Sequence, residues 1–162
     1  MILLSDANVL IDLGHVQGLD ILCQLETVEV LDVVLEECDH PSQPELITKI
    51  LEAGIQLIET KVDWLQAAKA YRQGNLSSPD LLNFYYAKTY KRLLLTNEKP
   101  LRTLCQQQNV TVHGTLWVIQ EAYQRQLSPP ATLCQWLKTL SSLDRRLPKQ
   151  VINQLKDTLG CS

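Results

Sequence analysis

Residues 2–13 read ILLSDANVLIDL, and this stretch predicts both the fold class and the place of the functional site. Ile2–Ser5 is a short apolar run that is typical of a buried strand, and Asp6 ends it. The apolar residues between Asn8 and Leu13 recur at helical spacing. A strand that passes through one acid directly into a helix is the usual start of a βαβ unit, in which the linked strands run parallel.

The alternation of strand and helix continues along the chain. Further strands are predicted at Val28–Val34, Ile55–Ile58, Arg92–Thr96 and Val110–His113. Further helices are predicted at Leu19–Leu25, Glu45–Ala53, Asp63–Tyr71, from Ser77 or Ser78 to Tyr90, at Lys99–Gln108, from Gly114, and from about Pro130 and Pro148. The expected fold class is therefore α/β, with a central parallel sheet flanked by helices.

Composition and motifs exclude several classes of protein. With 162 residues, 45% hydrophobic and 20% charged, the chain has the composition of a globular domain. There is no apolar run long enough for a membrane span and no basic segment typical of a signal peptide. Neither a G-x-S-x-G elbow nor a P-loop occurs. The five scattered cysteines indicate reduced thiols in a cytosol rather than a disulfide framework or a zinc site.

Charge is distributed unevenly between the two halves of the chain. Residues 1–63 contain thirteen Asp and Glu against two Lys, whereas residues 64–162 contain five acids and thirteen Lys and Arg. The basic half offers surface for phosphates despite the net charge of −3. The candidates for a weak RNA-binding track are Lys88, Lys91, Arg92, Lys99 and Arg102. A solvated helix face is the alternative interpretation of the same residues.

Acidic residues occur where predicted strands end or helices begin. Asp6 ends the first strand, Glu36 and Glu37 follow the second, Asp80 opens a helix, and Glu98 follows the fourth strand. Ligands of parallel sheets bind at the carboxyl ends of the strands, so these carboxylates are expected to face one edge. Clustered carboxylates repel one another, and a hard divalent cation relieves that repulsion. Helix capping is the alternative role for each acid taken singly.

Five motifs in order resemble the PIN-domain family. They are SDANVLIDL (residues 5–13), VVLEE (33–37), LSSPD (76–80), LLLTNEKPLR (93–102) and HGTLWVI (113–119). The last is similar to the VapC-like branch, and the resemblance spans residues 2 to about 127. It implies a PIN-like three-layer sandwich and an endoribonuclease that uses Mg²⁺ or Mn²⁺.

The resemblance also implies roles for individual residues. Its catalytic and metal-binding acids correspond to Asp6, Glu37, Asp80 and Glu98, with Asn8 and Thr96 supporting them through hydrogen bonds. Glu36 remains an alternative to Glu37. The family usually has Asp where this chain has Glu98, which puts the efficiency of the site in question, and Asn97 offers a neutral oxygen instead.

The VapC-like branch implies a biological role. Its members are toxins, so the resemblance implies a cytoplasmic homodimer blocked by a cognate antitoxin protein. A catalytically decayed PIN-like module that binds RNA or protein is the alternative, and a DNA nuclease would use the same site chemistry. Residues 1–127 are expected to form the nuclease domain, and 128–162 a helical extension packed on it. Apolar stripes in that extension fit either core packing or a groove for an antitoxin helix or a dimer contact.

Overall fold

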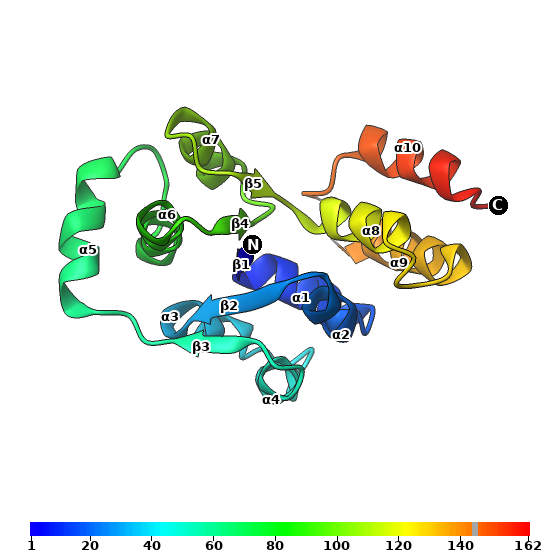
Figure 1. Cartoon of the computed structure of the whole chain (residues 1–162), viewed down its shortest axis with the longest axis horizontal. Coiled ribbons are helices and arrows are strands. Elements are labelled where there is room, and N and C mark those ends of the chain that lie inside the picture. The colour runs from blue at the N-terminus through cyan, green and yellow to red at the C-terminus, as the bar shows by residue number, and fades with distance from the viewer. Residues whose placement is uncertain (144–145) are drawn as a thin grey trace.

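The computed structural model describes residues 1–143 and 146–162 and has a five-stranded sheet at its centre (Figure 1). The strand order is β3-β2-β1-β4-β5, and every pair is parallel. The strands are β1 (Ile2–Ser5), β2 (Thr27–Leu31), β3 (Gln56–Ile58), β4 (Leu93–Leu95) and β5 (Val112–His113). This confirms the predicted α/β fold with a parallel sheet.

Strand β1 occupies the middle of the sheet because it is apolar on both faces. Leu3 pairs with Val28 of β2 on one side and with Leu93 of β4 on the other. Leu3 and Leu4 are fully buried, as are Leu94 and Leu95. Runs without alternation are expected where helices cover both faces of a parallel sheet.

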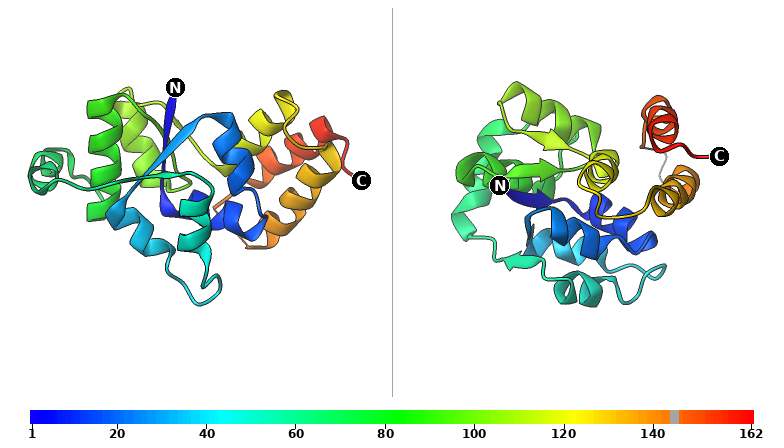
Figure 2. Two further views of the ribbon diagram at one scale, coloured as in Figure 1. Left: turned by 60° about the horizontal axis from the view of Figure 1, so that its bottom comes forward. Right: turned by 45° about the vertical axis from the view of Figure 1, so that its right-hand side comes forward.

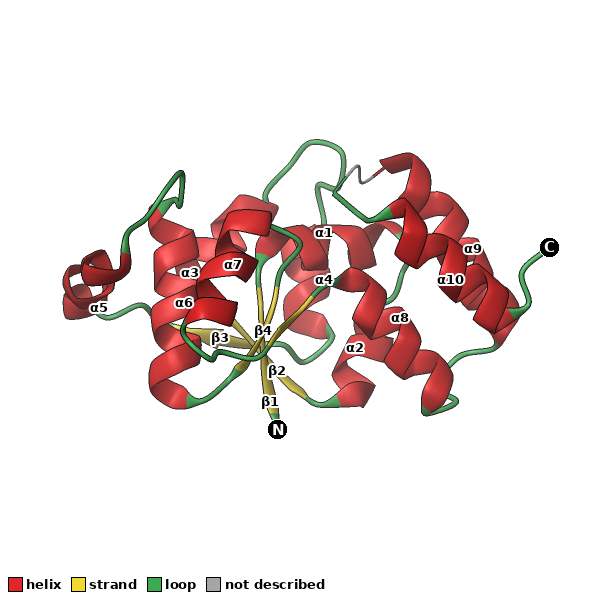
Figure 3. Cartoon of the chain, turned by 90° about the horizontal axis from the view of Figure 1, so that it is seen from above, coloured by secondary structure: helices red, strands yellow, loops and turns green. Residues whose placement is uncertain are grey.

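Helices cover the two faces of the sheet (Figure 3). The helical segments are α1 (Ala7–His15), α2 (Leu19–Leu25), α3 (Asp32–Leu35), η1 (Glu36–Cys38), α4 (Leu46–Glu52), α5 (Val62–Ala68), η2 (Lys69–Tyr71), α6 (Ser78–Tyr90), α7 (Lys99–Gln107), α8 (Thr115–Gln124), α9 (Pro130–Leu143) and α10 (Lys149–Leu159). Helices α6 and α7 pack together on one side, with α5 outside α6, whereas α1, α2, α4 and α8 lie on the other. The chain thus forms the three layers of a PIN-like sandwich.

The last two helices form a further layer beside α8. Helix α9 contacts α1 and α8, and α10 contacts α8 and α9, as the right-hand view of Figure 2 shows. The indole of Trp136 is buried and lies over Gly18, where an added Cβ would come within 2.7 Å of the ring. The absent side chain at Gly18 therefore lets α9 approach the first two helices.

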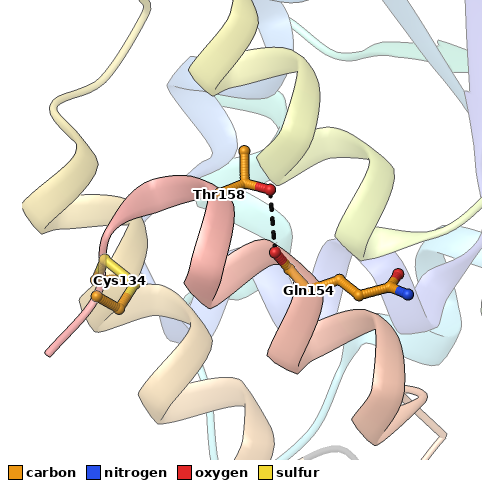
Figure 4. The surroundings of a disulfide bond; sticks show 4 residues. Cys134, Gln154 and Thr158 are labelled. Carbon is orange, nitrogen blue, oxygen red and sulfur yellow. Dashed lines mark hydrogen bonds between the residues drawn. A yellow bond between two sulfur atoms is a disulfide. The ribbon is translucent and has the colours of Figure 1, made fainter.

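A disulfide joins the two C-terminal helices. Cys134 of α9 is bonded to Cys161, just after α10, with their Cα atoms 5.6 Å apart (Figure 4). The prediction that all five cysteines are reduced thiols is therefore wrong for this pair. The antiparallel packing of α9 and α10 brings the two residues together across 27 positions, which the spacing of cysteines does not reveal. Cys23, Cys38 and Cys105 are free.

The second strand ends earlier than predicted. A strand was expected to Val34, but β2 stops at Leu31 and Asp32 begins α3. The Asp32 carboxylate accepts hydrogen bonds from the backbone of Val33 and from both the backbone and the hydroxyl of Thr60. These bonds turn the chain against the β preference of the two valines.

In the described parts of the chain, no helix is both long enough and apolar enough to cross a membrane.

Substituting Gly18 tests the packing of α9. Gly18→Ala is expected to lower the free energy of unfolding by about 1–3 kcal/mol, because the new methyl group overlaps the buried indole. Urea denaturation measures this loss. The cost should disappear in a Trp136→Leu background, where the ring is absent. A Gly18→Ala protein as stable as the wild type would contradict this packing.

Candidate functional site

The Asp6 carboxylate is the most tightly held acid at the carboxyl edge of the sheet. Asp6 is only 3% exposed and caps α1 directly after β1. Its Oδ1 accepts hydrogen bonds from the backbone N–H of Ala7 at 2.9 Å and from the amide of Asn83 at 3.2 Å. Its Oδ2 accepts from Asn8 at 2.9 Å and from the hydroxyl of Thr96 at 2.7 Å. Residues of α1 and α6 and the residue that follows β4 thus converge on one side chain.

Burial raises the pKa of Asp6 from 3.8 to about 6. The hydrogen bond from Thr96 acts in the opposite direction, and the nearby negative charge of Asp80 raises the pKa further. Asp6 is therefore a buried acid that makes no ion pair within residues 1–143 and 146–162, although its oxygens are well supplied with donors.

Asn8 and Thr96 connect Asp6 to the segment that carries Glu98. Besides donating to Asp6, the Thr96 hydroxyl accepts the backbone N–H of Glu98 at 3.1 Å. The side-chain oxygen of Asn8 accepts the backbone N–H of Asn97 at 2.9 Å. The turn between β4 and α7 is thereby set by the same two side chains that orient Asp6.

Asn97 anchors this turn to α8. Its amide donates to Asp12 at 3.1 Å and to the Thr115 hydroxyl at 2.9 Å, and its oxygen accepts the Thr115 backbone N–H at 3.0 Å. Gly114 is needed at this contact because a Cβ there would overlap the Asn97 side chain. The side-chain oxygen of Asn97, the alternative metal ligand, thus already accepts a hydrogen bond from the backbone of Thr115.

Asp80 is both a helix cap and a neighbour of the other acids. Its carboxylate accepts the backbone N–H of Ser77 at 3.1 Å, and the Ser77 hydroxyl accepts the backbone N–H of Asp80 at 3.2 Å. This capping box fixes the first turn of α6. Burial raises the pKa of Asp80, the bonds from Ser77 lower it, and the charge of Glu98 raises it.

Asn83 is a site residue that the sequence analysis did not identify. It lies three residues after Asp80 on α6, is fully buried and donates to Asp6. Its Oδ1 is a buried polar atom that has no hydrogen-bond partner among the described residues. The helical spacing from Asp80 was the available signal, because residues three apart share a helix face.

Glu37 lies in η1, within electrostatic range of the other three acids. Partial burial of its carboxyl group raises its pKa from 4.5 to about 7, and the charges of Asp6, Asp80 and Glu98 add to the shift. The residue as a whole is exposed, so water screens part of this effect. The carboxylate of Glu37 thus senses the charge of Asp6.

Glu98 is paired with a cation, whereas the other three acids form no ion pair in the part of the chain that the structure describes. It is the N-cap residue of α7, and its Oε1 accepts a hydrogen bond from Nη1 of Arg146. Arg146 belongs to the connection between α9 and α10, far from Glu98 in sequence. Like Asn83, it was not identified from the sequence, because no local pattern links it to the acids.

The chemistry of these residues suits a hard divalent cation. Asp6, Glu37, Asp80 and Glu98 offer carboxylate oxygens, and three of them have raised pKa values. The unpartnered Oδ1 of buried Asn83 adds a neutral oxygen beside Asp6. Within residues 1–143 and 146–162, no three His, Cys, Asp or Glu side chains are already grouped at coordination distance. An ion would therefore have to draw the carboxylates together.

The predicted basic track is divided between the two ends of the sheet. Lys88, Lys91 and Arg92 line a cavity of about 440 Å³ together with Met1, at the amino end of β1. Arg92 is also committed to the buried carboxylate of Glu29, with Nε 2.7 Å from Oε1. These three residues thus lie at the opposite end of the strands from Asp6.

Lys99 and Arg102 lie beside Glu98. Lys99 is exposed at the start of α7, immediately after Glu98. Arg102, one turn later, donates from Nη1 to the backbone oxygen of Thr96 at 3.1 Å. Of the five predicted basic residues, these two are the ones close to the acids in the structure.

A parallel α/β sandwich with acids at the carboxyl edge of its sheet belongs to the class of domains that bind ligands at the strand ends, and such acids can hold a divalent cation. A family model described as a PIN domain matches residues 2–160, so the chain belongs to the PIN-domain family. This confirms the resemblance to the PIN-domain family and indicates a nuclease-type function. The match includes α9 and α10. A comparison with curated proteins finds no match.

The raised pKa of Asp6 predicts a pH dependence of stability in the absence of divalent cations. Between pH 3.8 and about 6 the unfolded chain ionises at this residue while the folded state keeps the proton. Stability therefore falls as pH rises through this window, by up to about 3 kcal/mol. Below this pH window Asp6 is protonated in both the folded and the unfolded state. Above the window it is ionised in both states, and stability falls no further on its account.

Chemical denaturation of the wild type and of Asp6→Asn, at a series of pH values in chelator, measures this contribution. The stability of the wild type relative to Asp6→Asn should decrease from about pH 4 to about pH 6 and then level off. A difference between the two proteins that is independent of pH would contradict the assigned environment of Asp6.

Proposed function

We propose that this protein is a metal-dependent endoribonuclease that hydrolyses RNA phosphodiester bonds. The observation that carries the proposal is the set of four carboxylates at one edge of the sheet, where the charge of each affects the next. Such mutual repulsion is costly in a folded protein unless a cation offsets it. The chain also belongs to a family of nucleases, in which such a cation would assist phosphodiester hydrolysis.

Each acid has a distinct part in the proposed site. Asp6, Glu37, Asp80 and Glu98 are the proposed metal ligands, for Mg²⁺ or Mn²⁺. When bound, the ion would activate water and stabilise charge on the scissile phosphate. Asn8 and Thr96 hold the Asp6 carboxylate in a fixed orientation through their hydrogen bonds. Because Asp6 and Glu37 have raised pKa values, they would lose protons as the ion binds.

Lys99 and Arg102 are the proposed phosphate-binding residues beside the site. Lys99 is the first residue of α7, next to Glu98, and Arg102 lies one turn later. Lys88, Lys91 and Arg92 would contact RNA only if an RNA bound at the acids also reached the amino end of the sheet. A change at Lys99 should consequently weaken RNA binding more than the same change at Lys91.

We also propose the biological setting that the VapC-like motifs imply. The protein would be the toxin of a toxin–antitoxin pair, active in the cytoplasm as a homodimer and blocked by a cognate antitoxin. The proposal is supported by the segment HGTLWVI, which contains the last residue of β5 and the start of α8 next to Asn97. The reducing conditions of a cytoplasm would make the Cys134–Cys161 bond labile.

One observation favours a second candidate, a decayed PIN-like module that binds RNA without cutting it. Glu98 stands where the family usually has Asp, and its carboxylate is already paired with Arg146. A nuclease whose fourth acid is held in this way would retain the fold and the basic residues. It would lose the geometry that hydrolysis needs.

Cleavage of a mixed RNA pool with Mg²⁺ or Mn²⁺ tests the proposal. Asp6→Asn should reduce the rate at least about 100-fold, because it removes a charged ligand without changing the size of the side chain. Asp63→Asn is the matched control, since Asp63 is exposed in the first turn of α5 and should leave the rate unchanged. Chelator should abolish cleavage, and single-stranded DNA of equal length tests the preference for RNA.

The assay separates the two candidates. Cleavage that persists in Asp6→Asn would assign the activity to a contaminant or to another site. A wild type that binds RNA and cuts it with neither metal would establish the decayed module. In that event Glu98→Asp, which restores the usual family residue, is the variant expected to gain activity.

A further inference from the structure

Arg146 places a positive charge directly on the acidic site from a distant part of the chain. Its Nη1 donates to Oε1 of Glu98 across a sequence separation of 48 residues. The next residue, Leu147, is 5% exposed and is part of the hydrophobic core. Helix α10 follows at once and packs on α8 and α9. Arg146 is thus held close to Glu98 by the burial of its neighbour.

Glu98 is distinguished from its partners by this cation. Asp6, Glu37 and Asp80 have no ion pair within the described ranges, and the carboxylates of Asp6 and Asp80 accept hydrogen bonds from neutral donors. The pKa of Glu37 is raised by burial and by the charges of the other acids. Arg146 therefore offsets part of the repulsion among the four acids. It does so at the carboxylate that the proposed metal ion would also need.

One carboxylate oxygen cannot serve the guanidinium and a metal ion equally well. Mg²⁺ and Mn²⁺ bind carboxylate oxygens at short distances and in near-octahedral geometry. A ligand engaged by Arg146 must at least reorient before it can coordinate the ion. Glu98 is 37% exposed and Arg146 46% exposed, so the pair lies at a surface where water can replace either partner.

We propose that Arg146 is an internal counterion that competes with the divalent cation for Glu98. The inference rests on the proposed metal site. It makes Arg146 a positioning residue that acts through Glu98 and raises the concentration of metal at which the site fills. The connection between α9 and α10 would thereby control metal occupancy.

Isothermal titration calorimetry of the 162-residue protein with Mn²⁺ alone tests this competition. Arg146→Gln should bind Mn²⁺ about three- to tenfold more tightly than the wild type, because the ion no longer displaces a cation. Arg146→Lys keeps the charge and should remain close to the wild type. Lys149→Gln removes an equal charge three residues away and controls for a general change of field.

A Glu98→Gln background isolates the proposed route. Once the carboxylate is absent, Arg146→Gln should change the Mn²⁺ affinity less than twofold, as expected if the two residues act as one coupled pair. Equal affinities of Arg146→Gln and wild type would overturn the proposal. The proposal would also be overturned if Arg146→Gln increased the Mn²⁺ affinity by the same factor in the Glu98→Gln background as in the wild type. Such a result would reveal a general charge effect.

The outcomes also separate this inference from the proposed function. Failure of the nuclease is seen as absent RNA cleavage, whereas failure of the competition is seen in the ratio of Mn²⁺ affinities. Binding that is detected only in Arg146→Gln would support the competition. An absence of Mn²⁺ binding in every variant would overturn both the metal site and the inference.

Discussion

The structure depends on a single buried carboxylate. Asp6 is nearly inaccessible to water, and the hydrogen bonds to its two oxygens come from the backbone of α1 and from the side chains of Asn8, Asn83 and Thr96. An isolated charge in such a place would be strongly unfavourable, so the donors must arrive together and at the correct distances. The order of the central strands, with β4 beside β1, is what brings Thr96 to Asp6.

This requirement organises the polar residues around the site. Thr96 bonds at once to Asp6 and to the backbone of Glu98, and Asn8 bonds to Asp6 and to the backbone of Asn97. The side chains that satisfy the first acid therefore also fix the turn that presents the last one. The opposite end of the sheet has its own buried pair, Glu29 with Arg92, so each end of the strands balances charge separately.

The elements of the fold could be predicted because their signals are local. The apolar run at Ile2–Ser5 and the cap at Ser77 are visible over a few residues, and the structure has a strand and a helix start at those places. The end of β2 could not be predicted, because Asp32 turns the chain with the help of Thr60, which lies 28 residues later. The pairing of Cys134 with Cys161 requires knowledge of how α9 packs against α10.

The candidate site also has one part that could be predicted from the sequence and one part that could not. The acids could be named because parallel sheets gather strand ends at one edge, and the structure brings Asp6, Glu37, Asp80 and Glu98 within range of one another's charges. The basic residues could not be sorted by sequence alone. Lys91 and Lys99 are eight positions apart, yet strand β4 lies between them and carries them to opposite ends of the sheet.

The contact between Glu98 and Arg146 has a consequence for the order of synthesis. A ribosome makes the chain from the amino terminus, so all four acids and the strands that carry them emerge before Arg146. The sheet can begin to assemble on the nascent chain while the charge on Glu98 is still uncompensated. The final helices then deliver the balancing guanidinium, so that the acidic edge of the sheet acquires its counterion only as translation of this segment is completed.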